Sequence, residues 1–341
     1  MANPTGVSRD SDSAARRVGI VGLGAYMPDR VLTNADLEKM VDTTDQWIIE
    51  RTGILTRRIA RDDQATSDLA IEAARRALDR AKLKPDAVEL IIVATVTPDM
   101  PFPSTSCIIQ EKLGAFGAAC FDLNAACSGW IYAMDIAWQC VRSGRYGNAL
   151  VIGAEKLTAI TDWKDRNTCV LFGDGAGAAV IAPTGEGGGE IRSAYLGADG
   201  RFQKLLYLPA GGSRTPASRE TVDGRLHYMR MEGKETFKQA VTAMSHAAGV
   251  ALDRAGLTVD RVTWVIPHQA NMRILRAVAK RLGVPFEKVI SVIDHIGNIS
   301  AASIPVALEE AAGKGIIKAG DTTLLVAFGG GLTWGAMVLT M

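Results

Sequence analysis

The sequence predicts an α/β protein built from two copies of one unit. Strand-like and helix-like segments alternate through most of the chain, which is typical of parallel sheets covered by helices. The strand-like segments are apolar almost throughout, as expected for sheets that are buried on both faces. A set of short segments also recurs at one constant offset further along the chain, without a gap, so that position 77 corresponds to position 251. Together these observations indicate a fused duplication.

Two segments carry the repeat most clearly. Residues 77–81 read Ala-Leu-Asp-Arg-Ala, and the same sequence stands at 251–255. The turn at 124–129, Asn-Ala-Ala-Cys-Ser-Gly, falls on Asn-Ile-Ser-Ala-Ala-Ser at 298–303. Both copies of this turn have an asparagine, but only the first has a cysteine. Related halves that diverge at one turn suggest a single site at their interface, with different chemistry supplied by each half.

The first half shows strand and helix signals in alternation. An amphipathic helix is indicated where Leu69, Ala73 and Ala77 share one face. Gly22 and Gly24 are a weak signal for a dinucleotide loop, because no helix opens after them. The Gly-rich segment at 173–177 is interpreted as a turn before a strand and not as a phosphate loop. In order, we expect a strand at 18–22, a helix at 67–82, strands at 88–96 and 119–123, a helix at 131–141, and strands at 149–154 and 178–181.

The second half repeats this order. Gly-rich stretches at 185–189 and 210–213 are expected to be loops near the seam, so the boundary between the halves is placed near residue 190. The predicted organisation is a flexible tail at 1–17, one half at 18–190 and the other at 191–341. The expected elements are helices at 236–255, 271–282 and 301–312, and strands at 262–266, 289–293 and 322–328.

Composition excludes several classes of protein. The chain has 341 residues, enough for a large core, and a net charge of +1, which argues against a general nucleic-acid binder. Five cysteines without Cys-x-x-Cys spacing favour reduced thiols over a disulfide framework or a zinc site. The polar segment 1–17 lacks the apolar core of a signal peptide, and no apolar run is long enough to span a bilayer. We therefore expect a cytoplasmic protein that binds neither nucleic acid nor membranes.

Cys127 is the candidate nucleophile. A free cysteine is most often a buried structural residue, and that interpretation is kept for the other four cysteines. Cys127 differs because it stands between a strand and a helix, in the turn where the repeat diverges. A helix N-terminus stabilises a thiolate, so the pKa of this thiol is expected to be lowered. The small residues around Cys127 would let a carbonyl group approach closely.

Two further candidate site segments follow predicted strands in the second half. His268 follows the strand at 262–266, and strand carboxyl ends are where α/β folds place ligands. Position alone leaves a structural role for His268 equally open. The glycines of Phe328-Gly-Gly-Gly331 would let backbone N–H groups approach a ligand, although a flexible turn explains them as well.

Arg273 and Lys280 share one helix face, which is either simply solvated or a docking surface for an acidic carrier.

From about residue 18 to its end, the chain resembles β-ketoacyl-acyl-carrier-protein synthase III, of the thiolase-like superfamily. Each matching segment is weak alone, but their combination in this order is specific. The segments are Asp45-Gln-Trp-Ile-Ile-Glu-Arg-Thr-Gly53, Ala125-Ala-Cys-Ser-Gly129, Phe172-Gly-Asp-Gly-Ala-Gly177, Pro267-His-Gln-Ala-Asn271, Gly297-Asn-Ile-Ser-Ala-Ala-Ser303 and Phe328-Gly-Gly-Gly-Leu-Thr-Trp334. The resemblance implies a thiolase-like fold, with duplicated βαβαβαββ halves that form a layered αβαβα sandwich.

The resemblance also implies an activity and its residues. Cys127 would take an acyl group from a short acyl-CoA, expected to be acetyl-CoA, and release CoA. His268 and Asn298 would donate hydrogen bonds to the enolate formed when malonyl-acyl-carrier protein (malonyl-ACP) loses CO2, and this carbanion would attack the thioester. No metal or nucleotide cofactor is implied, and the partners are ACP and a second copy of the chain. By position, the resemblance also assigns the binding residues. The oxyanion hole would be the amides of Cys127 and Gly330, and CoA would meet Trp47, Arg51, Arg166 and Asn271. The acyl pocket would include Leu171, Phe172 and Phe102, with Phe102 reaching across a dimer interface, and ACP would dock on Lys238, Arg273, Lys280 and Arg281.

Alternatives remain open. A biosynthetic thiolase is disfavoured, because it needs a second cysteine near the C-terminal glycines and none follows Cys169. A type III polyketide synthase needs no carrier-docking face, and a non-catalytic carrier-binding subunit would not need the whole triad. A related ketosynthase or acyltransferase of secondary metabolism, with a different acyl acceptor, stays open. The length and branching of the primer also stay open, as does the choice between primary and secondary metabolism. The roles of the N-terminal tail and of His295 are not determined by the sequence.

Overall fold

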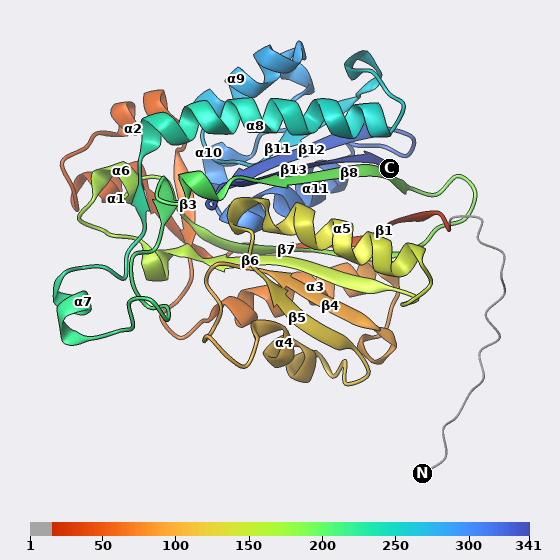
Figure 1. Ribbon diagram of the computed structural model, residues 1–341, viewed down its shortest axis with the longest axis horizontal. Coiled ribbons are helices and arrows are strands. Elements are labelled where there is room, and N and C mark those ends of the chain that lie inside the picture. The colour runs from red at the N-terminus through yellow and green to blue at the C-terminus, as the bar shows by residue number, and fades with distance from the viewer. Residues whose placement is uncertain (1–15) are drawn as a thin grey trace.

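The computed structural model describes residues 16–341, so most of the tail predicted at 1–17 lies outside the described residues. Two mixed sheets lie roughly parallel to each other, with helices between them and on both outer faces (Figure 1). The predicted fold class, a layered αβαβα sandwich, is confirmed. The first sheet has the order β1 (Val18–Tyr26), β7 (Asp174–Pro183), β6 (Ala149–Lys156), β4 (Leu90–Ala94) and β5 (Ala119–Leu123). The second has the order β11 (Trp264–Pro267), β12 (Thr322–Gly329), β13 (Thr333–Thr340) and β8 (Glu190–Ala198).

Strand β4 shows why the sheets need helices on both faces. Ile92 packs in the central cluster between the sheets, whereas its neighbours Ile91 and Val93 pack in the cluster under the outer helices. Successive side chains of a strand point to opposite faces, so a strand that is apolar throughout must be covered twice. The layer between the sheets consists of α5 (Gly129–Arg142) and α11 (Ser303–Gly313). The outer layer on the first sheet consists of α3 (Thr66–Ala81) and α4 (Thr105–Leu113). The outer layer on the second sheet consists of α8 (Gly233–Arg254) and α9 (Met272–Leu282).

Smaller elements surround one end of the two sheets. Two ribbons of antiparallel strands and several short helices make up this region, near α2 and α6 in Figure 1. They are β2 (Arg30–Thr33) paired with β3 (Thr56–Ile59), β9 (Leu206–Tyr207) paired with β10 (Arg230–Met231), and the helices α1 (Asn34–Glu38), α2 (Asp45–Thr52), α6 (Arg166–Cys169), α7 (Arg219–Asp223) and α10 (Ile293–Ile296).

The two glycines that weakly suggested a dinucleotide loop have a packing role. Gly22 and Gly24 lie within β1, and a Cβ atom at either position would come within 2.2 Å of a backbone oxygen of α3. Their lack of a side chain therefore lets α3 lie directly on the strand.

Two sequence predictions about local structure are wrong. The segment 173–177 is not a turn, because β7 begins at Asp174 and pairs with β6 along most of its length. Gly177 is a glycine because a Cβ atom there would lie 2.7 Å from Pro305 of α11. The strand predicted at 289–293 is only an isolated bridge between Val289 and Val265, followed by the short helix α10. Residues that suit a strand locally do not form one there, since the chain turns away to build the second of the repeated turns.

Candidate active site

The two repeated turns have the same backbone. A short 3-10 helix stands at Ala126–Ser128 (η2) and again at Ser300–Ala302 (η7), and each leads directly into a central helix, α5 or α11. The first residue of each has a positive φ, 48° at Ala126 and 46° at Ser300. L-residues rarely adopt this conformation, so its occurrence at both repeat-related positions marks a shared and specialised turn.

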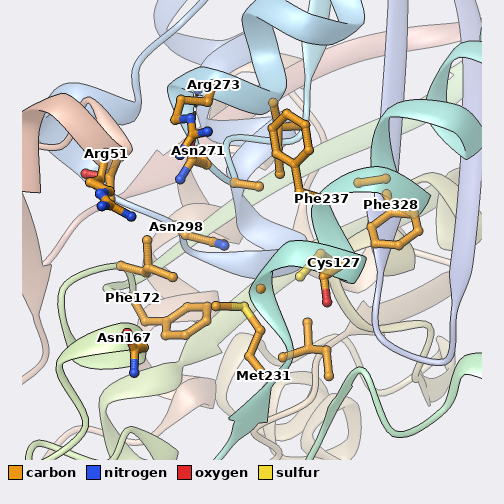
Figure 2. Close-up of a pocket in the computed structure, with 18 of the residues that line it drawn as sticks. Arg51, Cys127, Asn167, Phe172, Met231, Phe237, Asn271, Arg273, Asn298 and Phe328 are labelled. Atoms are coloured by element: carbon orange, nitrogen blue, oxygen red, sulfur yellow. Dashed lines mark hydrogen bonds between the residues drawn. The ribbon is translucent and has the colours of Figure 1, made fainter.

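Cys127 lies in the first turn and lines a cavity of about 770 Å³. Figure 2 shows its sulfur at the centre of the pocket, with Met231 and Phe328 nearby and Asn298 on the opposite side. The residue is 8% exposed. Burial raises the pKa of the Cys127 thiol to about 12, so the expectation of a lowered pKa is wrong for this structure. Desolvation of the charged form outweighs the helix terminus here.

The backbone around Cys127 is held tightly against the end of β12. A Cβ atom on Gly329 would lie 2.6 Å from the backbone nitrogen of Cys127, so this position has no room for a side chain. The hydroxyls of Ser128 and Thr333 are hydrogen-bonded to each other at 2.7 Å, and each lies 2.8 Å from the carbonyl oxygen of Ala125. These contacts fix the Cys127 amide relative to the glycines after β12.

His268 and Asn298 both line the same cavity. His268 follows β11 and is 2% exposed, and burial lowers its pKa to about 3, so the imidazole is neutral at physiological pH. Its Nδ1 atom is buried without a hydrogen-bond partner among the described residues. Oδ1 of Asn298 accepts a hydrogen bond from the backbone nitrogen of Ser300 at 3.0 Å. Because the oxygen is occupied, the side-chain NH2 is the part of Asn298 left to donate into the pocket.

Charged and aromatic residues lie toward the other end of the pocket. Trp47 and Arg51 line the cavity, and the Arg51 guanidinium lies 5.2 Å from the centre of the Trp47 ring. Arg166 is not among the lining residues, but its guanidinium lies 5.1 Å from the same ring. Asn271 caps α9, and Arg273, which also lines the cavity, lies beside it (Figure 2). The three predicted CoA residues of α2 and α6 therefore form one cluster around Trp47.

The predicted acyl-pocket residues divide into two groups. Leu171 and Phe172 line the cavity near Cys127, whereas Phe102 lies outside it and is 84% exposed. The segment before Phe172 is fixed by the fully buried Arg57, which donates to the carbonyl of Val170 at 2.7 Å. Of the glycines at the end of β12, Gly329 lines the cavity and the predicted oxyanion-hole residue Gly330 does not.

The basic residues expected to meet a carrier lie on two neighbouring helices. Lys238 is on α8, and Arg273, Lys280 and Arg281 are on α9; all four are exposed. Arg281 bridges the helices by donating to Oγ1 of Thr242, and the Arg273 guanidinium packs on a ring of α8. Because Arg273 also lines the pocket, this basic face leads directly to the pocket mouth.

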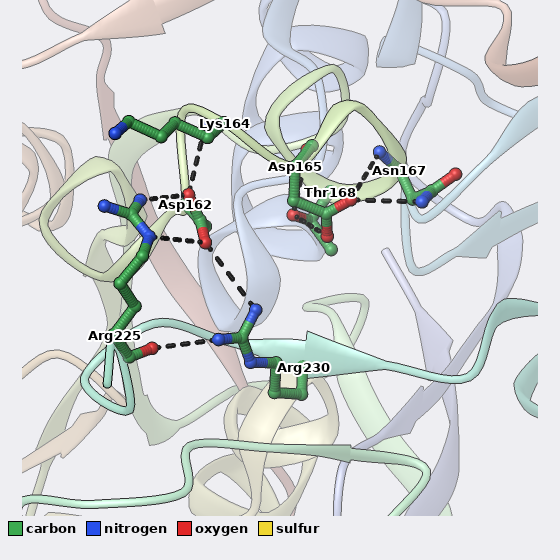
Figure 3. A network of polar contacts seen from close by, with 7 residues as sticks. All are labelled: Asp162, Lys164, Asp165, Asn167, Thr168, Arg225 and Arg230. Atoms are coloured by element: carbon green, nitrogen blue, oxygen red, sulfur yellow. Dashed lines mark hydrogen bonds and ion pairs between the residues drawn. The ribbon is translucent and has the colours of Figure 1, made fainter. Parts of the chain in front are cut away.

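Sequence reasoning missed the segment that closes one side of the pocket. Met231 belongs to β10, and the chain before it is clamped by Asp162, which accepts contacts from both Arg225 and Arg230 (Figure 3). Nη2 of Arg230 also donates to the carbonyl of Arg225 at 3.0 Å. Phe237 of α8 lines the pocket as well. The only sequence signal for it is the apolar face of that helix, which predicts burial and not a binding site.

Comparisons with known proteins match the chain to one family. The model of the family 3-Oxoacyl-[acyl-carrier-protein (ACP)] synthase III matches residues 121–200, and the model of its C-terminal part matches residues 252–341. The chain is 59% identical over 321 residues to beta-ketoacyl-[acyl-carrier-protein] synthase III of Caldanaerobacter subterraneus, covering 94% of this chain and 97% of the relative.

Solved structures are similar over nearly the whole chain. A 3-oxoacyl-[acyl-carrier-protein] synthase III from Aquifex aeolicus has a TM-score of 0.88 at 48% identity, covering 95% of this chain and all of the other. The priming beta-ketosynthase of the R1128 polyketide biosynthetic pathway has a TM-score of 0.88 at 35% identity, covering 96% and 97%.

Proposed function

The chain belongs to the β-ketoacyl-acyl-carrier-protein synthase III family of condensing acyltransferases, and on this premise we propose how its own residues perform the reaction. Cys127 attacks the carbonyl carbon of a short acyl-CoA, expected to be acetyl-CoA, and becomes acylated as CoA leaves. Malonyl-ACP then loses CO2, and the carbanion attacks the acyl-Cys127 thioester to give 3-oxoacyl-ACP. The observation that carries this assignment is that Cys127, His268 and Asn298 are all buried and line one cavity.

Neutral hydrogen-bond donors suit the condensation step. Decarboxylation generates the carbanion itself, so the enzyme needs groups that stabilise the developing enolate oxygen and no strong base. His268 is kept neutral by burial, and Asn298 has only its NH2 group left to donate. The chemistry uses acyl-CoA and malonyl-ACP as substrates and needs no metal or nucleotide cofactor.

The pocket supports binding of CoA at the Trp47 end. Trp47 offers a flat surface for an adenine ring, and Arg51 and Arg166 bring positive charge to the same place for phosphate groups. The pantetheine arm then passes Asn271 on its way to Cys127. In this assignment Leu171 and Phe172 bound the acyl group, and the amides of Cys127 and Gly330 form the oxyanion hole.

The first test is intact mass after the protein is mixed with an equimolar panel of acyl-CoAs from acetyl to dodecanoyl. A single adduct that maps to Cys127 would identify both nucleophile and primer, and no adduct from any of them would overturn the assignment of acyl-CoA as donor. Supplying malonyl-ACP or another acceptor to the acylated protein then separates condensation from acyl transfer in secondary metabolism. Only the former releases CO2.

Docking of ACP is proposed on the basic face of α8 and α9, formed by Lys238, Arg273, Lys280 and Arg281. Charge reversal at Lys280 and Arg281, which do not line the pocket, should raise the KM for malonyl-ACP and leave the KM for acyl-CoA nearly unchanged, because complementary charge mainly guides the protein partner. Equal effects on both substrates would mean that the face is only solvated. Charge reversal at the exposed Lys82, which ends α3 in the opposite outer layer, is the matched control.

A homodimer is proposed through the outer edge of the first sheet. Strand β5 is the last strand of that sheet, and exposed aromatic residues lie in and near it at Phe102, Phe116 and Phe121. Pairing with a second copy would bury this edge and bring Phe102 toward the partner's acyl pocket. Sedimentation velocity at several protein concentrations tests the assembly, and a monomer at micromolar concentration would contradict it.

A further inference from the structure

Arg57 of β3 is a buried arginine to which the proposed mechanism gives no role. It has no exposed surface, and among the described residues its guanidinium donates only to neutral oxygen atoms. These are Oδ1 of Asn34 at 2.8 Å and the carbonyls of Val170 at 2.7 Å and of Leu32 at 3.4 Å. Burial lowers the pKa of Arg57 to about 10, so the group is still charged at neutral pH. Burying a charge that no carboxylate compensates is costly, which indicates a role beyond stability.

The stem of Arg57 lies against two glycines beside the site. A Cβ atom on Gly297 would lie 3.0 Å from the Cβ atom of Arg57, and one on Gly173 would lie 3.1 Å from it. Gly297 also has a φ of 68°, a conformation that favours glycine. The arginine therefore packs directly on two segments that line the pocket, one ending at Gly173 and the other beginning at Gly297.

Main-chain hydrogen bonds join these two segments. The backbone nitrogen of Asn298 donates to the carbonyl of Leu171 at 2.9 Å, and the nitrogen of Gly173 donates to the carbonyl of Asn298 at 3.1 Å. Phe172 and Asn298 thus form an isolated parallel bridge. Since the Oδ1 atom of Asn298 is bonded to the nitrogen of Ser300, the direction of its NH2 group depends on where the 171–173 segment stands.

The Arg57 guanidinium holds the start of that segment. Val170 directly precedes it, and its carbonyl accepts from Nη2 of Arg57. Nη1 donates to Asn34, whose own amide donates to the carbonyl of Ile54 at 2.8 Å and is thereby fixed to the chain before β3. Hydrogen bonds from a charged donor are stronger than neutral ones, and the planar fork of arginine sets two of them in a fixed geometry. Arg57 therefore ties the pocket segment to β3.

We propose that Arg57 is a positioning residue for condensation, which orients the Asn298 amide by fixing the 171–173 segment. The inference rests on the proposed function, in which Asn298 donates to the enolate oxygen. Arg57 does not line the cavity, so it acts through Asn298 and not on the substrate. The Cys127 amide is held by separate contacts of Ser128 and Thr333, so acylation should depend little on Arg57.

The test compares the two half-reactions in Arg57→Lys, which keeps a positive charge and most of the stem but loses the fork. Single-turnover acylation at saturating acyl-CoA should stay within about twofold of the wild-type rate, and condensation of the acylated protein with malonyl-ACP should be about 10-fold slower. The difference arises because a hydrogen bond to a developing oxyanion depends on distance and angle, whereas apolar packing around the acyl group tolerates small shifts. Equal losses in both half-reactions, or no loss in either, would overturn the proposal.

A second measurement separates positioning from a merely structural role. In the Asn298→Ala background, Arg57→Lys should cause no further loss of condensation, because the group that it orients is already gone. A further loss of about 10-fold in that background would contradict the proposal, since it would show that Arg57 acts by another route.

Arg58→Lys is the matched control. Arg58 is the next residue of β3 and also donates to backbone carbonyls, those of Pro28 at 3.2 Å and Asp29 at 3.3 Å, but it does not contact the 171–173 segment through any of these bonds. Its variant should keep both rates. All rates are measured well below the Tm of each variant, so that loss of folded protein does not enter the comparison.

Gly173→Ala shifts the same segment without removing the buried charge. Its new Cβ atom would press on the stem of Arg57 and should slow condensation about 10-fold while sparing acylation. This variant decides the question alone if Arg57→Lys does not fold. If the wild-type protein neither acylates nor condenses, the proposed function fails. If it does both and the two variants match it, only the positioning role of Arg57 fails.

Discussion

The turn at 124–129 and its copy at 298–303 have one backbone and two kinds of chemistry. In each, an asparagine side chain accepts a hydrogen bond from the nitrogen two residues on, at 3.2 Å from Ala126 and at 3.0 Å from Ser300. Asn124 is exposed, but Asn298 is buried in the pocket. The first turn offers a thiol, and the second offers an amide and a hydroxyl. The two turns therefore share one backbone geometry but present different side chains.

The largest expected effect is at Cys127, the proposed nucleophile in the first turn. Cys127→Ala should lower acyl transfer on the order of 10⁶-fold, as loss of a covalent nucleophile does in other enzymes. Cys127 would then match Ala301, its counterpart in the second turn. Cys140→Ala on α5 is the control for a thiol outside the pocket and should retain normal turnover, measured as release of CoA. Substantial transfer by Cys127→Ala would remove the difference between the turns on which the mechanism depends.

The two asparagines provide the next comparison. Asn298→Ala should still acylate Cys127 but lose about 10²–10³-fold in condensation, the typical cost of losing one donor to a developing oxyanion. Asn124→Ala loses an equivalent backbone contact and should condense nearly normally. Single-turnover assays with acyl-CoA alone and then with malonyl-ACP measure the two steps. Equal losses in both variants would show that the asparagines act only by shaping the turns.

A smaller effect is expected at Gly329, the residue of the second half that packs against the backbone of the first turn. Gly329→Ala would place a Cβ atom 2.6 Å from the backbone nitrogen of Cys127, which must shift the amide proposed for the oxyanion hole. We expect acylation to slow about 10²-fold. Gly249→Ala, inside α8 and without any atom within 4 Å of the new methyl group, should keep its activity and gain about 1 kcal/mol in stability. Unchanged acylation by Gly329→Ala would argue against this contact.

The smallest effect concerns an ion-pair cluster present only beside the second turn. His295 contacts Asp294 and Glu310 at 2.9 Å each, where the first half has Phe121 and Ile136 in place of His295 and Glu310. Hydrogen bonds to Asp294 and Glu310 raise the pKa of His295 from 6.5 to about 9. This contribution to stability is complete below pH 6.5 and is lost as pH rises through 9. The Tm should fall by a few degrees over that window.

His295→Gln is the matched variant for this pH dependence. It should lower the Tm at pH 6 and flatten its decline across the same window, while acylation at Cys127 changes little. A decline that is the same in both proteins would show that the cluster does not anchor the turn.

Within residues 16–341, no helix is both long and apolar enough to cross a bilayer. The same residues contain no group of three or more histidine, cysteine, aspartate or glutamate side chains arranged to hold a metal ion.

Much of the fold followed from local patterns. The internal repeat, the continuous apolar strands and the amphipathic helices predicted the duplicated architecture. Cys127 and Asn298 were singled out by the repeated turn and His268 by its place at a strand end, whereas their joint catalytic role was implied only by the resemblance to a family. The same local reasoning failed at 289–293, where apolar residues suit a strand but the chain leaves the sheet. It also failed to explain Gly22 and Gly24, whose role depends on how closely a distant helix approaches.

By itself, the sequence determined which residues stand at the strand ends, since periodicity and turn chemistry depend on near neighbours in the chain. Only the tertiary structure decided what surrounds them. The sign of the pKa shift at Cys127 depends on burial by both halves, and burial is a property of packing. Long-range packing sets desolvation and proximity, and these decide the chemistry of the site.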